Sequence, residues 1–193
     1  SSNLLAKRVD AGRRGARVVV VRAGKAEPAQ VPLAVPADNA RAETIVATLA
    51  SDGALDVAYS AEAKGHYAVE VRATYINEPD RREQLTAGVN RRYGQGVLSE
   101  VNFSKLGDLE APVRMSYRFK VADSLSRDGG RARLKPLWPS FDWTHITVTE
   151  TRRFDIITGT PGQTVTTCTV KLPPKWKVSD APPDVVLDQP FAH

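Results

Sequence analysis

The sequence predicts a mainly β fold of the α+β class, a β-sandwich of antiparallel strands with one or two helices inserted around residues 66–93. Three observations support this prediction. Short runs of β-branched and aromatic residues alternate with Gly and Pro turns along most of the chain. Residues 113–121 alternate between apolar and polar side chains, which is typical of a strand with one buried and one solvated face. Helical spacing of apolar residues is found only in the middle of the chain.

The first 41 residues are expected to form a strand and a connector that lead in from an upstream domain. The Val-rich stretch 16–22 predicts the strand. Residues 23–41 carry a proline at every fourth position, Pro28, Pro32 and Pro36, which disfavours a helix and favours an extended connector. The chain opens on Ser-Ser-Asn without a Met, which suggests a piece of a longer protein. We therefore divide it into residues 1–41 and a β-sandwich domain over 42–193.

The first half of the second domain predicts a hairpin followed by helix. Residues 43–50 and 54–60 are β-prone and flank an Asp52-Gly53 turn, which predicts the hairpin. Residues 66–75 fit a strand or a helix equally well by periodicity. Residues 79–93 favour a helix, with a proline at its first turn and apolar residues at helical spacing.

The second half predicts strands only. They are expected over residues 97–103, 113–121, 145–157 and 164–172, with a turn at 128–130 and short final strands at 178 and 185–187. No internal repeat interrupts this order.

Composition sets limits on the function. With 193 residues, 41% apolar and 25% charged, the chain can fold around its own core. A single cysteine excludes an internal disulfide and a cysteine-rich zinc site. No apolar run reaches the length of a membrane-spanning helix. The net charge of +5 favours anionic partners in general, but the basic residues are spread out and most are expected to lie on a solvated surface.

No group of residues predicts a catalytic site or a cofactor, so we expect a non-enzyme without cofactors or metal. Cys168 lies within a predicted strand, where a small buried side chain is expected rather than a nucleophile. The three histidines share no metal-ligand spacing. Five carboxylates are candidates for paired acid–base chemistry, but most occupy turns, where acids usually cap backbone groups: Asp52, Asp56, Glu62, Asp108 and Glu110.

An aromatic stretch is the most unusual local feature. Trp138, Phe141 and Trp143 lie close together in the sequence and follow Arg131 and Arg133. The favoured interpretation is that the rings fill one end of the sandwich core. The alternatives are a carbohydrate-binding platform based on the two tryptophans, and stacking on single-stranded nucleic acid, for which one loop is thin evidence.

The order of features resembles that of bacterial multidomain proteins with a transglutaminase-like core between two β-rich domains of unknown function. The matching segments are a Gly-Arg and hydrophobic strand, a proline connector ending in Asn, an Asp-Gly hairpin, a Gly-His-Tyr-Ala segment, an alternating strand and a Leu-Pro-Pro-Lys-Trp-Lys-Val segment. In this chain they lie at residues 10–21, 31–39, 52–53, 65–72, 112–121 and 172–178, and an Arg-Arg-Phe-Asp segment matches at 152–155.

The resemblance implies that this chain is the C-terminal β-rich domain of such a protein. It favours a helix over residues 65–75 and a periplasmic or extracellular location. The implied function is a non-catalytic accessory domain that packs on the upstream catalytic domain and helps to position a protein or cell-envelope substrate. The catalytic Cys-His-Asp of the core has no match here. The alternative remains a carbohydrate-binding module that uses Trp138 and Trp143; a basic nucleic-acid binder and a stand-alone hydrolase rank below it.

Overall fold

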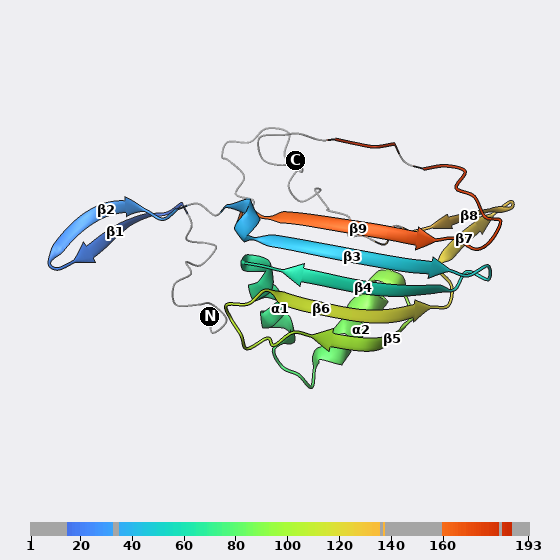
Figure 1. Cartoon of the computed structure of the whole chain (residues 1–193), viewed down its shortest axis with the longest axis horizontal. Helices are drawn as coiled ribbons and strands as arrows, with labels where there is room; N and C mark the ends of the chain where they lie inside the picture. Colours follow the sequence, from blue (N-terminus) through green and yellow to red (C-terminus); the bar gives the residue numbers. More distant parts are fainter. Residues whose placement is uncertain (1–14, 33–34, 136, 138–159, 182, 187–193) are drawn as a thin grey trace.

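The structure, a computed structural model, describes residues 15–32, 35–135, 137, 160–181 and 183–186. A five-stranded sheet forms its centre, with strand order β5-β6-β4-β3-β9, and two helices lie against one face (Figure 1). Two short hairpins, β1–β2 and β7–β8, form separate sheets. The elements in chain order are β1 (Arg17–Arg22), β2 (Lys25–Gln30), the short 3-10 helix η2 (Pro36–Asp38), β3 (Ala40–Leu49), β4 (Leu55–Ala63), α1 (His66–Tyr75), α2 (Arg81–Tyr93), β5 (Gly96–Phe103), β6 (Val113–Val121), β7 (Leu125–Asp128), β8 (Arg131–Leu134) and β9 (Gln163–Lys171).

This architecture confirms the predicted mainly β, α+β class, with two helices where the helical insert was expected. It differs from the predicted arrangement in two respects. In the described part of the chain, the helices rather than a second large sheet cover one face of the central sheet. In addition, β9 pairs with β3 in parallel, whereas the other strand pairs are antiparallel. Parallel strands require a long crossover connection, and 113 residues lie between the end of β3 and the start of β9.

The two faces of the sheet differ because side chains alternate along each strand. On β6, Val113, Met115, Phe119 and Val121 are buried toward the helices, as the alternating sequence predicts. The opposite face carries the charged side chains of the same strand. There the Arg114 Nε lies 2.8 Å from the Glu62 Oε2 of β4. The buried face therefore forms the core, and the open face is held by ion pairs exposed to solvent.

Asn39 joins three elements that are distant in the sequence. It is only 4% exposed, and its Oδ1 accepts a hydrogen bond from the first backbone N–H of α1, at His66. Its Nδ2 donates to the backbone oxygen of Pro161, and its own backbone oxygen accepts from the Gln163 N–H at the start of β9. The helix is thus capped by a residue 27 positions earlier, since its own N-cap residue, Gly65, has no side chain to do so.

Arg72 fixes α1 to the loop between β5 and β6. Its side chain is buried, at 1% exposed, and its Nε donates to the Leu106 backbone oxygen at 3.0 Å. Its Nη2 donates to the backbone oxygens of Asp108 and Ala111 at 2.6 and 2.7 Å. A buried cation is retained here because these carbonyls replace the water that it loses.

The chain before β3 forms a hairpin, not the fully extended connector that its prolines predicted. β1 pairs with β2 in register from Arg17–Gln30 to Arg22–Lys25, with Pro28 opposite Val19. Proline is tolerated because a two-stranded ribbon has free edges, where its missing N–H leaves no bond unmade. The hairpin projects away from the central sheet (Figure 1).

The predicted final strands are wrong for the described residues. Val178, Val185 and Val186 are 67%, 80% and 92% exposed and belong to no strand. An apolar run forms a strand only where a neighbouring edge can pair with it, and the chain leaves the sheet after Lys171. The strand expected over residues 145–157 lies outside the described residues.

Candidate functional site

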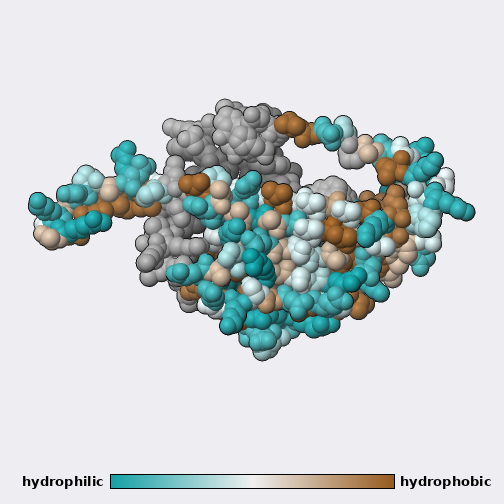
Figure 2. All heavy atoms as spheres, in the orientation of Figure 1, coloured by the Kyte–Doolittle hydropathy of each residue, from teal (hydrophilic) through white to brown (hydrophobic). Residues whose placement is uncertain are grey.

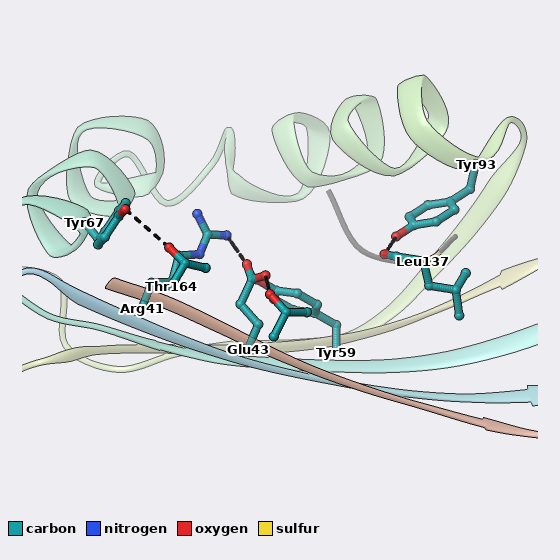
Figure 3. A network of polar contacts seen from close by, with 8 residues as sticks. Arg41, Glu43, Tyr59, Tyr67, Tyr93, Leu137 and Thr164 are labelled. Atoms are coloured by element: carbon teal, nitrogen blue, oxygen red, sulfur yellow. Dashed lines mark hydrogen bonds and ion pairs between the residues drawn. The ribbon is translucent and has the colours of Figure 1, made fainter. Parts of the chain in front are cut away.

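A buried polar cluster lies between the helices and the sheet. Glu43 of β3 is 4% exposed. Its Oε1 lies 2.6 Å from the Arg41 Nη2 and accepts a hydrogen bond of 2.7 Å from the Tyr59 hydroxyl. Its Oε2 accepts a hydrogen bond of 2.9 Å from the Thr166 hydroxyl of β9. Figure 3 shows Arg41, Glu43 and Tyr59 meeting above the sheet, from two neighbouring strands.

Most polar side-chain atoms of this cluster bond to one another, and the Arg41 Nε is buried without a hydrogen-bond partner among the described residues. The Arg41 Nη2 also donates to the Tyr59 hydroxyl at 3.1 Å, so the three side chains form a closed triangle. Burial raises the pKa of Tyr59 well above its usual range, which keeps the phenol protonated and donating. The Tyr59 ring stacks on Tyr117 at 4.7 Å between centroids. The carboxylate already accepts two hydroxyl protons and a guanidinium, so the geometry suits a tie between β3, β4 and β9 better than a general base.

The single thiol lies on the same face of the sheet, on β9. Cys168 is partly buried and packs against the core. Burial raises the pKa of its thiol, which disfavours the reactive thiolate. Of the three histidines, only His66 is among the described residues, and its Nε2 lies 3.0 Å from the Glu70 Oε1. The described residues therefore do not assemble a Cys-His pair around this sulfur.

The carboxylates considered for paired acid–base chemistry are dispersed. Asp52 accepts a hydrogen bond from the Ala54 N–H, and Asp108 from the Glu110 N–H, so both stabilise turns. Asp56 forms an ion pair on the open face of the sheet, as Glu62 does. Within the described ranges, no group of three His, Cys, Asp or Glu side chains could hold a metal ion.

A basic pocket is the second polar feature, at the end of the sheet where β9 ends. The tip of hairpin β7–β8 and the segment after β9 lie side by side there (Figure 1) and line an open pocket of about 550 Å³. Among the described residues that line it, four side chains are cationic, one is anionic and one is aromatic. The cations are Arg127, Arg131, Lys175 and Lys177, the anion is Asp128 and the aromatic residue is Trp176. We call this the basic pocket.

One wall of the basic pocket is the hairpin β7–β8. Its turn, Gly129-Gly130, has φ values of 50° and 82°, which glycine adopts at little cost. Leu125 at its base packs against the core, and the Arg127 Nη2 donates to the Ser51 backbone oxygen at 3.1 Å. The hairpin is therefore held from both its base and its side, and Arg131 lies exposed at its tip.

The other wall is a tight turn after β9. Pro173 is buried, and its backbone oxygen accepts a hydrogen bond of 3.1 Å from the Trp176 N–H. Lys175, between them, has a φ of 72°, in the left-handed region. Trp176 packs against the core, so Lys175 and Lys177 on either side of it are exposed.

The structure describes two of the five site residues predicted from the sequence, and one of these two lines the basic pocket. Arg131 lines the basic pocket, whereas Arg133 is exposed on the same strand and does not line it. Trp138, Phe141 and Trp143 lie outside the described residues, so the carbohydrate platform stays a prediction.

Sequence reasoning missed Lys175, Trp176 and Lys177 as part of a site. In the sequence, the Pro-Pro-Lys-Trp-Lys segment contributes only to the family resemblance. Its combination of a rigid turn with two lysines around an aromatic residue is the pattern that points to a basic surface.

The comparisons with known proteins add no assignment: no protein-family model, curated protein or solved structure matches this chain. Neither described helix has the length and apolar character needed to cross a membrane.

Proposed function

We propose that this chain is a non-catalytic accessory domain of a larger transglutaminase- or protease-like protein. It packs on the catalytic core through hairpin β1–β2 and helps to position a protein or cell-envelope substrate. The proposal rests on two observations. The order of sequence features resembles that of such proteins, and hairpin β1–β2 is exposed to solvent.

Hairpin β1–β2 exposes large apolar side chains to solvent. Val19 and Val21 are 65% and 69% exposed, and they share one face with Ala26 and Pro28, which lie opposite them. Figure 2 shows apolar residues along this projection. A two-stranded hairpin without a third strand or a helix against it is marginally stable in water. Packing against a neighbouring domain would bury this face and stabilise the hairpin.

The buried cluster around Glu43 is consistent with a non-catalytic role. Its carboxylate is saturated by Arg41, Tyr59 and Thr166. Burial raises the pKa of the Cys168 thiol. Both groups are better suited to holding the sheet together than to reacting with a substrate.

The reading frame upstream of Ser1 tests the proposal. We expect it to encode a transglutaminase-like core in which a cysteine begins a helix and is followed by a histidine and an aspartate. In the longer protein, backbone amides of β1–β2 should exchange with solvent more slowly than in the 193-residue chain, because the core covers them.

A matched pair of variants makes this test specific. In the longer protein, V19S/V21S should restore fast exchange in the hairpin. Val97→Ser changes an apolar residue on β5 that is 74% exposed, and it should leave hairpin exchange unchanged. Equal exchange of the hairpin in the long and short chains, or an upstream frame without the core, would refute the proposal.

A further inference from the structure

The basic pocket carries positive charge that the described residues do not neutralise. Among them, the ion pairs lie at Glu43, on the open face of the sheet and within α1, and none involves a cation of the pocket. Of the described residues that line it, Asp128 is the only carboxylate, against four cations. Cations held close together repel one another and raise the local concentration of anions.

We propose that the basic pocket is a binding site for a small phosphate ester. The inference does not depend on the proposed accessory function. The pocket volume of about 550 Å³ falls within the range of small-molecule sites, roughly 300–1,000 Å³. Both walls are tied to the core, through Leu125 and through Trp176, so little ordering is needed when a ligand binds.

The lining chemistry favours a phosphate ester over a single carboxylate. Four cations around one small volume match a group that carries close to two negative charges on three oxygens, as a phosphate monoester does near neutral pH. The guanidinium of Arg131 can bind two of these oxygens at once, and the lysines add mobile point charges. Trp176 supplies an aromatic wall for the organic part of the ester.

Phenyl phosphate is a suitable probe, because it joins a ring to a single phosphate. In a titration of the whole chain followed by NMR, it should shift the Trp176 indole N–H signal in a saturable way. A Trp176→Phe variant identifies that signal among the three tryptophans. Phenol at equal concentration should cause no saturable shift, because it lacks the charge. No saturable shift with phenyl phosphate would overturn the proposal.

Two double variants separate the pocket from general basic charge. R131Q/K177Q removes one arginine and one lysine from the pocket, and it avoids Lys175, whose backbone is left-handed, and Arg127, which bonds to Ser51. R91Q/K105Q makes the same change at exposed residues outside the pocket. The dissociation constant should rise about tenfold or more in the first variant and less than about twofold in the second. Equal effects would overturn the proposal.

A further titration tests whether the phosphate group that binds belongs to a small ester or to a nucleic acid. A short single-stranded DNA titrated under the same conditions should bind no more tightly than phenyl phosphate per phosphate group. If only the DNA binds, with a steep dependence on salt, the site is part of a nucleic-acid surface and the proposal of a small ester is overturned. Unchanged far-UV circular dichroism in both double variants ensures that the comparison is made between folded proteins.

Discussion

Replacing Glu43 with leucine should reveal how much the buried cluster contributes to stability. Glu43→Leu keeps a side chain of similar size and leaves the Arg41 guanidinium without its carboxylate. Breaking a buried ion pair from one side costs about 3–5 kcal/mol. The Arg41 side chain is 33% exposed, so water screens part of the loss and the low end of that range applies. The hydroxyls of Tyr59 and Thr166 also lose their acceptor, at about 1 kcal/mol each before rearrangement.

We therefore expect the free energy of unfolding to fall by about 3–5 kcal/mol in Glu43→Leu, with the lower value if the two hydroxyls find other acceptors. Urea unfolding followed by far-UV circular dichroism measures this change. The control is Glu62→Leu, which removes a carboxylate paired with Lys64 and Arg114 on the open face and should cost about 1 kcal/mol or less.

A double variant separates the cost of the unpaired Arg41 charge from the cost of the lost hydrogen bonds. In R41M/E43L no unpaired cation remains, so the loss should shrink to about 2 kcal/mol or less. If Glu43→Leu is no more destabilising than Glu62→Leu, the cluster is not the structural tie that its contacts indicate, and a role in binding or catalysis would have to be considered.

Two further predictions concern buried ionisable groups, namely two tyrosines and the single cysteine. Burial raises the pKa of Tyr59 and Tyr117, so their neutral forms stabilise the fold fully below the unfolded tyrosine pKa of about 10, and that stability is lost as the pH rises above it. Urea unfolding between about pH 8 and 11.5 should show this decline, reduced in Tyr117→Phe; a flat profile would contradict it. Burial also raises the pKa of Cys168, so iodoacetamide at about pH 8 should modify it more slowly in the folded chain than in urea. Faster modification of the folded chain would indicate an activated thiol.

Much of the secondary structure could be predicted because it depends on short-range patterns. The alternation over residues 113–121 gives a strand with one buried face wherever that strand is placed. The Asp52-Gly53 turn brings two neighbouring β-prone runs together, and they pair as β3 and β4. Apolar spacing after Pro79 produces α2. For residues 66–75 the periodicity fits both states, and only the resemblance pointed to the helix that is found.

The basic pocket could not be predicted as a unit, because its two walls are far apart in the sequence. Arg131 was a candidate through its proximity to the aromatic stretch, whereas it lies in the pocket with Lys177, from a turn that begins after β9. Nothing in either local sequence specifies that they meet. The pairing of β9 beside β3, and the packing of Trp176 against the core, bring the two segments together.

The sequence by itself determined α2, the hairpin of β3 and β4, and the strands β5, β6 and β9, since each depends on interactions among residues a few positions apart. Only the tertiary structure decided that β9 runs parallel to β3, that Asn39 caps α1, and that Glu43 accepts from Thr166. These contacts join residues between 27 and 123 positions apart. Their formation depends on how the apolar faces pack together, which a local pattern does not specify.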